Sequence, residues 1–444
     1  MALIIAMTTL VDDVAYDVNG GDELRIDRGI ILQSLMDTAV FNYAGRCSVL
    51  NNGTISAAVD GIQMGITGWR DDIVSPSQTV TNNGLITAER NTVVLYGTDP
   101  VVANTGTITG SVGVFLKDVT IYVPEIGNSA GEQYLTNTGT IVGQDIGVLM
   151  SCSLEDGHHT IKNSGTIIGI GDAAIRMEGT FGTIINAGRI VGDVEMLGLF
   201  NRYDGRAGIV AGTVSGSTGQ DEFVAGSGAD MFDGGGVSDG DGDGEDEVIF
   251  ATAAGVQYAL DGSFAGSGVT VGDTYINIEG LWGSNIGSDR LRGDANDNTL
   301  RGRGGNDTLA GVQGNDTLNG GDGRDVMSGG AGDDDFIYSS LGHAGDRILD
   351  FEGGPSGGDS IGLVRQAVEG SGLVVGIVAA RHFRARADNL AQDADDRFIF
   401  RTTDTTLWFD RNGNVSGGLT LIADLQAGAV VTAANIEIDY LYYV

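Results

Sequence analysis

The sequence has 444 residues, of which 74 are glycine and only 4 are proline. A collagen or a disordered linker would be rich in both residues, so these two classes are excluded, and a hydrophobic fraction of 41% is enough to form a core. The chain has 60 acidic and 24 basic residues, a net charge of −36, so we expect cations as partners and neither nucleic acid nor an anionic membrane surface.

The N-terminal residues give no export or membrane signal. The opening stretch, MALIIAMTTL, is apolar but lacks a basic flank and a cleavage site, so it is a poor secretory signal. The chain contains no run of 18 apolar residues, so we expect no membrane insertion. We interpret Cys47 and Cys152 as buried thiols, because two cysteines cannot form a disulfide framework. Residues 1–48 are assigned to an N-terminal cap.

Residues 49–212 repeat a short phrase, Asn-x-Gly-x-Ile, six times. Its glycines run from Gly53 to Gly188, and each is followed and preceded by short alternating strand-like pieces. Repeat units of some 20–35 residues that each hold about three short strands are typical of one coil of a parallel β-solenoid. The sequence therefore predicts an all-β fold that begins with a parallel β-solenoid.

Two side-chain ladders are expected in this solenoid. The isoleucines of the phrase should stack inside, and the asparagines should stack at a corner, where their amides bond the next coil. The glycines should permit a left-handed turn at that corner. The isoleucines are Ile55, Ile86, Ile108, Ile141, Ile167 and Ile190, and the asparagines are Asn51, Asn82, Asn104, Asn137, Asn163 and Asn186.

A parallel β-solenoid can also be an enzyme that cleaves or epimerises polysaccharides, which needs an acid, a base and charge-neutralising groups on one face. Two expected loops carry such residues: Glu155, Asp156, His158 and His159 in one, and Arg70, Asp71 and Asp72 in the other. Neither set is a recognisable catalytic cluster, and we interpret the two histidines as an exposed loop pair. No HExxH motif supports a zinc protease. We therefore assign no catalytic residue.

Residues 213–283 contain an irregular acidic period. Asp221, Asp230 and Asp239 are nine residues apart, and an aromatic residue follows the first two at the second place. The acidic run DGDGDGEDE imitates the start of an EF-hand loop through Asp239, Asp241, Asp243 and Gly244, but its twelfth position is Phe250 and not glutamate. We predict distorted calcium-binding turns with an extra acidic loop, and we expect the three aspartates to be ligands.

Residues 284–338 contain a regular period of nine. The anchors are Asp289, Asn298, Asp307, Asp316, Asp325 and Asp334, and each is followed two places later by an apolar residue, from Leu291 to Phe336. Glycines mostly stand two and five places before the anchor, so their carbonyls can point at a cation. These glycines are Gly302, Gly305, Gly311, Gly314, Gly320, Gly323, Gly329 and Gly332. Hard oxygen ligands without thiol or imidazole fit several calcium ions.

The pattern Gly-Gly-x-Gly-x-Asp-x-U-x resembles the RTX, or hemolysin-type, calcium-binding nonapeptide repeat. The resemblance implies a parallel β-roll in which two nonapeptides complete an 18-residue coil and calcium lies between turns on one side. The same-side pairs are then Asp289 with Asp307, Asp307 with Asp325, Asn298 with Asp316, and Asp316 with Asp334. Asn298 keeps an oxygen but no charge, so we expect its site to be weaker.

Residues 339–444 resemble the C-terminal part of proteins exported by type I secretion. The segments DRILDFEGGPSGGDSIGL and DRFIFRTTDTTLWFDRNGN carry this resemblance, as TYINIEGLWGSNIGSDRLRGD does for a joining segment before the roll. It implies a C-terminal secretion and capping module that the type I machinery recognises without an N-terminal signal peptide. Asp410, Asn412 and Asn414 alternate, which suits either one more cation or a hairpin turn on Asn-Gly, and we interpret them as the hairpin.

These features together predict an extracellular or cell-surface protein that folds after export, when calcium binds. We expect chelation to melt residues 213–340 first. The leading functional hypothesis is a non-enzymatic structural protein that forms a homo-oligomer or polymer as a layer, fibre or matrix, or an adhesin that contacts cell-surface polysaccharide. The alternative is a polysaccharide lyase or epimerase with a solenoid catalytic domain.

Overall fold

The structure is a computed structural model that describes residues 3–5, 9–11, 16–17, 21–42, 46–65, 77–117, 131–152, 157–236, 245–354, 358–415 and 417–439. In these residues the regular elements are β-strands and four single-turn 3-10 helices, which confirms the expected all-β fold. No helix in the described part of the chain is long and apolar enough to cross a membrane. The sequence-based boundaries at residues 48, 212, 283 and 338 stay predictions.

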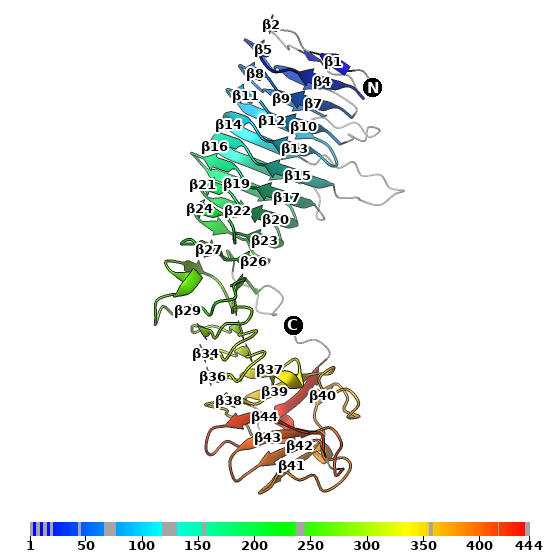
Figure 1. Cartoon of the computed structure of the whole chain (residues 1–444), viewed down its shortest axis with the longest axis vertical. Coiled ribbons are helices and arrows are strands. Elements are labelled where there is room, and N and C mark those ends of the chain that lie inside the picture. Colours follow the sequence, from blue (N-terminus) through cyan, green and yellow to red (C-terminus); the bar gives the residue numbers. More distant parts are fainter. Residues whose placement is uncertain are drawn as a thin grey trace. The chain divides into compact units, whose positions relative to one another are not determined.

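The chain divides into two compact units. The first contains Met1–Gly226, Asp230–Asp246 and Thr274–Asn277, and the second contains Ser227–Ala229, Glu247–Asp273 and Ile278–Val444. In the first unit, parallel strands stack coil upon coil, as the blue-to-green ribbon of Figure 1 shows. Each complete coil gives one strand to one sheet and two to the other, so the unit is a parallel β-solenoid.

The strands of the first unit form three parallel rows. The first row is β1 (Leu3–Ile5), β4 (Glu23–Ile26), β7 (Ser48–Asn51), β10 (Thr79–Asn82), β13 (Val101–Asn104), β15 (Glu132–Asn137), β17 (His158–Asn163), β20 (Phe181–Asn186), β23 (Phe200–Asp204) and β26 (Gln220–Val224). The second is β2 (Thr9–Val11), β5 (Ile31–Ser34), β8 (Thr54–Ala57), β11 (Leu85–Ala88), β14 (Thr107–Lys117), β16 (Thr140–Ser151), β18 (Thr166–Gly169), β21 (Arg189–Val191) and β24 (Ile209–Ala211). The third is β3 (Tyr16–Asp17), β6 (Val40–Asn42), β9 (Ile62–Met64), β12 (Asn91–Tyr96), the C-terminal halves of β14 and β16, β19 (Ala173–Glu178), β22 (Val194–Met196), β25 (Val214–Ser215), β27 (Met231–Asp233) and β30 (Thr274–Ile276).

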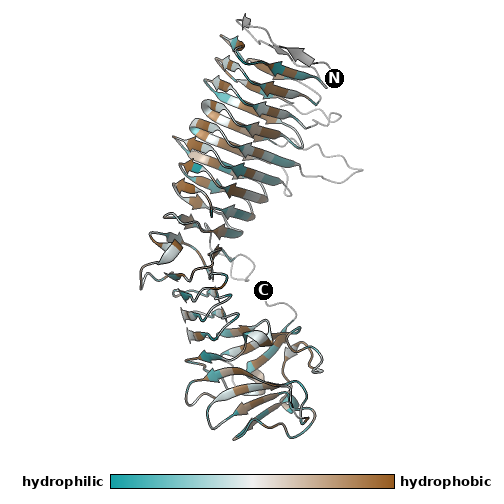
Figure 2. Cartoon of the chain, viewed as in Figure 1, coloured by the Kyte–Doolittle hydropathy of each residue, from teal (hydrophilic) through white to brown (hydrophobic). Residues whose placement is uncertain are grey.

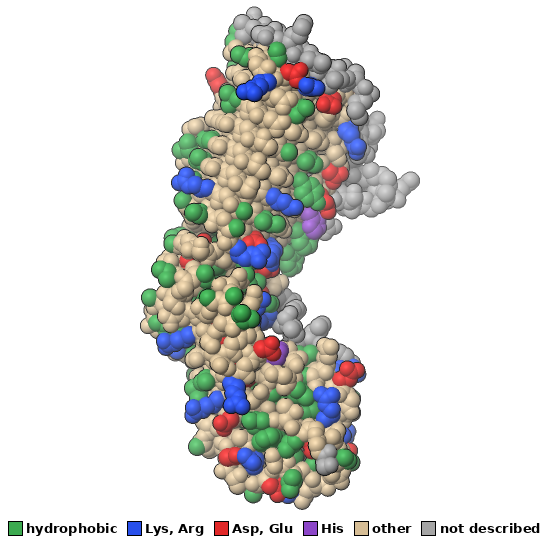
Figure 3. Space-filling view, in the orientation of Figure 1, with side chains coloured by type: hydrophobic (Ala, Val, Ile, Leu, Met, Phe, Trp, Pro, Cys, Tyr) green, Lys and Arg blue, Asp and Glu red, His purple; other side chains and the backbone are tan. Residues whose placement is uncertain are grey.

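The predicted isoleucine ladder forms the interior of this solenoid. From Ile55 to Ile190 each isoleucine pairs in register with that of the next coil, and all six are fully buried. Figure 2 shows apolar positions that recur from coil to coil. Figure 3 shows charged side chains scattered over the surface. Because successive strand residues point to opposite faces, an alternating sequence is enough to separate core from surface.

The predicted asparagine ladder is also present. Five of the six amide nitrogens donate to the amide oxygen of the next coil, from Asn51 Nδ2 to Asn82 Oδ1 at 2.8 Å through to Asn163 Nδ2 to Asn186 Oδ1 at 2.9 Å. Five of the six oxygens therefore accept across a coil boundary, and all six side chains are buried. The ladder satisfies buried polar groups within itself, as a stable core requires.

The expected left-handed turn at the glycines that follow these asparagines is wrong. None of the six glycines has a φ in the left-handed region. Their role is close approach: a Cβ at Gly84 would lie 2.0 Å from the carbonyl oxygen of Gly53, and one at Gly106 would lie 2.0 Å from that of Gly84. The corner therefore needs glycine because the coils touch there, backbone against backbone.

We predict that Asn137→Ala destabilises the solenoid by about 1–3 kcal/mol, because its neighbours in the ladder lose a buried donor and a buried acceptor. The urea midpoint of the folded chain in calcium measures the effect. Asn83 is the control: it bonds Asn52 at 2.9 Å in an exposed pair, so Asn83→Ala should change stability by less than about 0.5 kcal/mol. Equal midpoints for the two variants would contradict a structural role for the ladder.

The second unit contains a β-roll of 18-residue coils. One sheet contains β28 (Glu247–Ile249), β31 (Gly280–Trp282), β33 (Thr299–Arg301), β35 (Thr317–Asn319), β37 (Asp335–Tyr338), β39 (Ser360–Val364), β45 (Ile436–Asp439) and β40 (Gly376–Ile377). The other contains β29 (Gln257–Ala259), β32 (Arg290–Arg292), β34 (Thr308–Gln313), β36 (Val326–Ala331), β38 (Asp346–Ile348), β44 (Leu419–Leu425), β43 (Thr406–Asp410), β42 (Phe398–Arg401) and β41 (Phe383–Arg386). The 3-10 helices are η1 (Gly268–Thr270), η2 (Leu341–His343), η3 (Ala380–His382) and η4 (Ala433–Asn435).

The predicted period places one apolar side chain per nonapeptide inside the roll. Leu291 pairs with Leu309 and Leu309 with Met327 in one sheet, while Leu300 pairs with Leu318 and Leu318 with Phe336 in the other. All six are at most 1% exposed. Partners in a pair are 18 residues apart, so the predicted two-nonapeptide coil is confirmed.

The C-terminal part continues both sheets of the roll. Strand β44 pairs with β38, and β45 pairs with β39, so the last coil does not end in open strand edges. Strands β43 and β44 are antiparallel, with Asp410 opposite Leu419, and Asp410 Oδ1 accepts a bond from the Asn412 backbone N–H. This pairing agrees with the hairpin interpretation, although the connection is longer than two residues.

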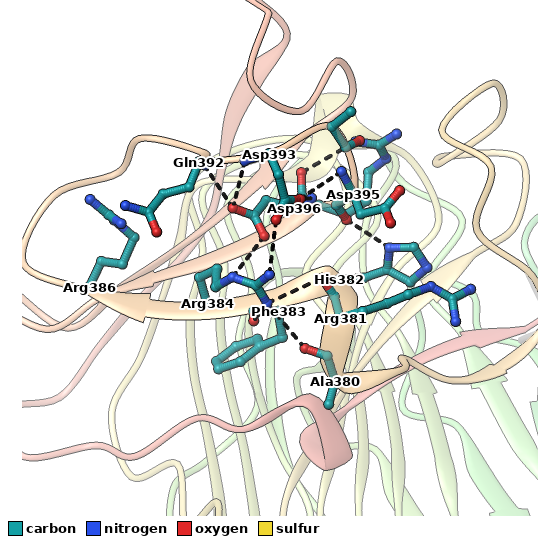
Figure 4. A network of polar contacts seen from close by, with 12 residues as sticks. Ala380, Arg381, His382, Phe383, Arg384, Arg386, Gln392, Asp393, Asp395 and Asp396 are labelled. Atoms are coloured by element: carbon teal, nitrogen blue, oxygen red, sulfur yellow. Dashed lines mark hydrogen bonds and ion pairs between the residues drawn. The ribbon is translucent and has the colours of Figure 1, made fainter.

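A polar network fixes the segment between η3 and β42 (Figure 4). Arg384 Nε lies 2.9 Å from the fully buried Asp396 Oδ1, and the backbone N–H of Gln392 donates to Asp396 Oδ2 at 2.7 Å. His382 Nδ1 contacts the carbonyl oxygen of Asp395 at 2.7 Å. The buried carboxylate has both a cation and a donor, so this network is structural.

Candidate metal centre

The acidic anchors of the regular repeats form two ladders, one along each sheet of the roll. In the first, Asp289 N donates to Asp307 Oδ1, and Asp307 N donates to Asp325 Oδ1, both at 2.7 Å. In the second, Asn298 N donates to Asp316 Oδ1 at 2.8 Å, and Asp316 N donates to Asp334 Oδ1 at 2.9 Å. The structure thus brings together the four pairs expected from the sequence.

Both ladders extend beyond the anchors that we predicted. Asp325 N donates to Asp346 Oδ1 at 2.9 Å, and Asp334 N donates to Asp359 Oδ1 at 3.1 Å. The period of nine did not reveal these residues, because the steps are 21 and 25 residues and not 18. The available signal was the apolar residue two places later, which is Ile348 after the first and Ile361 after the second.

One oxygen of each central aspartate has no hydrogen-bond partner among the residues that the structure describes. The Oδ2 atoms of Asp307, Asp316, Asp325 and Asp334 accept no hydrogen bond, although these side chains are only 1% exposed. Each Oδ2 faces the first glycine of its own nonapeptide. A Cβ at Gly302 would lie 2.2 Å from Asp307 Oδ2 and 2.5 Å from the carbonyl oxygen of Gly320, and Gly311 has the same surroundings.

This arrangement fits a hard cation. A carboxylate oxygen and a backbone carbonyl oxygen face one point, which only glycine leaves open, and the carboxylate is out of reach of water. In the described residues no three His, Cys, Asp or Glu side chains converge as a metal cluster, so backbone carbonyls must complete the ligand set. Oxygen ligands of this mixed kind suit calcium.

The turn glycines supply backbone freedom as well as space. Gly305, Gly314, Gly323 and Gly332, two places before their anchors, have φ values of 138°, 105°, 150° and 147°. These conformations are accessible to glycine and rare for other residues. Glycine is therefore needed at two positions of each nonapeptide for different reasons. The first glycine leaves room for the aspartate oxygen, and the later one allows the chain to turn.

Burial raises the pKa of the ladder aspartates. The pKa rises to about 7 for Asp307 and Asp316 and to about 6 for Asp334, in each case mainly because burial disfavours the charged form and partly because of neighbouring aspartates. A bonded backbone N–H opposes each rise. Without a cation, each buried negative charge therefore lowers the stability of the folded roll.

We predict that the calcium-free roll loses stability as pH rises from about 4 to about 7. In this window the folded aspartates keep protons that the unfolded chain has released, so raising the pH removes a stabilising term. In millimolar calcium the trend should reverse, because protons compete with the ion for the same oxygens. Thermal melts with chelator and with calcium measure both slopes, and parallel slopes would contradict the site.

The first turns of the regular set differ from the central ones. Asp289 Oδ2 accepts bonds from Ser284 N at 2.7 Å and from Ser284 Oγ at 3.1 Å, so the protein itself satisfies this oxygen. Asn298 Oδ1 accepts from Asp294 N at 2.8 Å. Both residues occupy the predicted ladder positions. Because protein groups already donate hydrogen bonds to their oxygens, these residues depend less on a cation than the central aspartates do.

The irregular set is also satisfied largely by the protein. Asp221 accepts from Asn201 Nδ2 at 2.7 Å and from Ser217 N at 2.8 Å, and its pKa is raised to about 6, chiefly by burial. Asp230 Oδ2 accepts from Gly226 N at 2.8 Å. Asp246, which we did not predict, accepts from Asp221 N at 2.8 Å.

Asp239 and the rest of the EF-hand-like run, Asp241, Asp243 and Gly244, lie outside the described residues. The ligand role of Asp221, Asp230 and Asp239 therefore stays a prediction.

The solenoid histidines do not form the loop pair that we expected. They lie in strand β17, so alternation turns them to opposite faces. His158 is exposed and stacks on Phe181 at 4.4 Å, whereas His159 is buried, Nε2 contacts the carbonyl oxygen of Glu178 at 3.0 Å, and burial lowers its pKa. Arg70, Asp71, Asp72, Glu155 and Asp156 lie outside the described residues.

The two cysteines form no disulfide. Cys47 is buried as expected, but Cys152 is only half-buried, because it follows the last residue of strand β16.

Two nonapeptides carry a side chain where the backbone favours glycine. Arg303 and Val312 have φ values of 75° and 106°, and the equivalent residues of the next two nonapeptides are Gly321 and Gly330, at 88° and 112°. A residue with a branched Cβ is strained there, at a cost of about 1–3 kcal/mol. The strain works against formation of the calcium-binding turns.

We predict that Val312→Gly stabilises the roll by about 1 kcal/mol and lowers the calcium concentration at which it folds. The control is Val326→Gly, another half-buried valine of the same sheet whose φ is not in the left-handed region. That change should destabilise by about 1 kcal/mol, because glycine weakens a strand. Calcium titrations followed by circular dichroism compare the variants, and a matching loss in both would contradict the strain.

Comparison with protein families identifies the repeats that form this roll. The family model of the RTX calcium-binding nonapeptide repeat matches residues 211–240, 284–318 and 310–340. These repeats bind calcium ions, so calcium is a ligand of this chain. The solution structure of the AlgE6R3 subunit of the Azotobacter vinelandii mannuronan C5-epimerase is 30% identical, with 36% of this chain and 82% of that chain covered and a TM-score of 0.24. No curated protein matches the chain.

Proposed function

We propose that this chain, which belongs to the proteins with RTX calcium-binding nonapeptide repeats, is a secreted structural protein whose roll folds on calcium outside the cell. The observation that carries the proposal is the buried Oδ2 atom of each of the four central aspartates, which has no hydrogen-bond partner among the described residues. A folded roll without a cation leaves these oxygens uncompensated, and calcium removes that cost.

Calcium concentration then acts as the folding switch. Extracellular calcium modules bind at about 10⁻⁴–10⁻³ M, a level that the outside of the cell supplies and the cytosol does not. Inside the cell the acidic repeats repel one another and stay open, which suits passage through a type I secretion channel. Outside, binding to the folded state alone shifts the equilibrium toward the roll.

The solenoid offers a surface for contact with a second copy of the chain. On the outer face of the first sheet row, Phe181 stacks between His158 at 4.4 Å and Phe200 at 5.4 Å. Phe200 is 45% exposed, and Leu197 and Leu199 beside it are about half exposed. Hydrophobic side chains also gather next to a histidine on this unit in Figure 3. Exposed apolar clusters of this kind favour association.

We predict that electron microscopy reveals ordered sheets or filaments when millimolar calcium is present and dispersed particles when it is chelated. Phe200→Ser should weaken assembly at least tenfold in critical concentration, because it removes the end of the aromatic stack. Leu85→Ser, which changes another exposed apolar strand residue of the solenoid, is the control and should assemble normally.

Discrete particles in both conditions would contradict the assembly proposal. In that case the chain should be incubated with acidic polysaccharides, and cleavage or epimerisation would replace the structural role with the enzymatic one.

A further inference from the structure

We propose that an additional calcium site closes the roll beyond its last nonapeptide and is held by Asp334 together with Asp350, a residue outside the repeats. The inference rests on calcium binding by the repeats and is independent of the assembly proposal. It concerns the point where the 18-residue period ends and the chain enters β38 and β39.

At the end of the repeats, the backbone N–H of the first glycine in the turn has a different hydrogen-bond acceptor. In earlier turns this glycine donates its N–H to a backbone carbonyl of the next coil, as Gly293 does to Ala310 and Gly302 does to Asn319, both at 2.9 Å. Gly329 donates instead to Asp350 Oδ1 at 3.1 Å. A carboxylate oxygen thus accepts the glycine N–H bond that a neutral backbone carbonyl accepts in the earlier turns, and it lies next to the first glycine of the last nonapeptide.

The same glycine faces an aspartate oxygen without a partner. A Cβ at Gly329 would lie 2.0 Å from Asp334 Oδ2, which is buried and accepts no hydrogen bond. Asp334 and Asp350 therefore approach Gly329 from two segments of the chain. Asp359 adjoins them, with Oδ1 accepting from Asp334 N at 3.1 Å and Oδ2 accepting from Glu352 N at 2.7 Å.

Acidic side chains gather at this point. Asp350 bonds Gly329 N, the Cβ position of Gly329 faces Asp334, and Asp359 bonds Asp334 N. Both oxygens of Asp359 accept backbone N–H bonds, whereas Asp350 Oδ2 accepts from the Ser328 hydroxyl, which can rotate to another acceptor. Asp334, Asp350 and backbone carbonyls would therefore ligate the ion directly. Negative charge of this density calls for a divalent cation.

The extra carboxylate sets this site apart from the inner ones. The affinity of an oxygen site for calcium rises with the number of charged ligands. Inner turns pair an aspartate with neutral carbonyls, as at Gly302 and Gly311. The terminal site should therefore bind more tightly than the inner sites and fill first, and it would join the last nonapeptide to the C-terminal strands.

The test is isothermal titration of the full-length, calcium-stripped chain with CaCl₂, comparing the unmodified protein with Asp350→Asn. We expect the variant to lose the tightest binding event, with one ion fewer per chain or at least a tenfold weaker first step. Circular dichroism at saturating calcium confirms that the roll has formed.

Two variants serve as controls. Asp297→Asn removes an equal charge from the same roll: Asp297 Oδ1 accepts from Asn315 N at 2.6 Å, and asparagine already does this at Asn306 and Asn315 in later turns. Ser328→Ala removes the 2.6 Å bond from Ser328 Oγ to Asp350 Oδ2 and keeps the charge. Both controls should keep the first binding step.

An unchanged first step in Asp350→Asn would overturn the proposal, and so would an equal loss in Ser328→Ala, because that result would make Asp350 a packing residue only. If Asp350→Asn does not fold, a calcium-bound crystal structure of the unmodified chain decides. An ion about 2.3–2.6 Å from oxygens of both Asp334 and Asp350 supports the site, and no ion shared by them refutes it. Assembly seen by microscopy can fail without affecting either result.

Discussion

The roll depends on how its buried aspartate charge is neutralised. Each of the four central aspartates accepts the backbone N–H of the preceding coil with one carboxylate oxygen, and its other oxygen is buried against a glycine without a hydrogen bond from the described residues. The apolar side chains inside the coil are too few to offset several uncompensated carboxylates, since one residue per nonapeptide points inward. In the proposed function, calcium supplies the missing charge, so ligand binding and folding of the roll become one event.

The solenoid stacks its coils with the same parallel geometry but without this dependence. Its corner ladder uses asparagine, which both donates and accepts, so each amide meets the need of the next. An aspartate ladder lacks the donor and carries a charge, and therefore needs an ion. The solenoid ladder thus satisfies its own amides, whereas the roll ladder leaves one oxygen of each central aspartate for a cation.

Features that follow a sequence period were predictable, and features that break it were not. The core positions from Ile55 to Ile190 and the pairing of Asp307 with Asp325 follow from repeat spacing. Asp346, Asp350 and Asp359 fall after the period of nine ends, so only the folded chain brings them to the roll. The corner glycines were assigned for the wrong reason, because sequence does not distinguish a left-handed backbone from a close contact between coils. The predicted loop position of His158 and His159 is wrong because both residues lie in strand β17.

Hydrogen exchange of the full-length chain in calcium and in chelator tests the central claim most directly. The amide protons of Asp307, Asp316 and Asp325 donate to the carboxylates of the next coil, so they report on the ladders themselves. With calcium, we expect these amides to be protected as strongly as those of the solenoid core. With chelator, they should exchange at the rate of an unfolded chain while the solenoid amides stay protected. Equal protection of the ladder amides in both conditions would contradict the account.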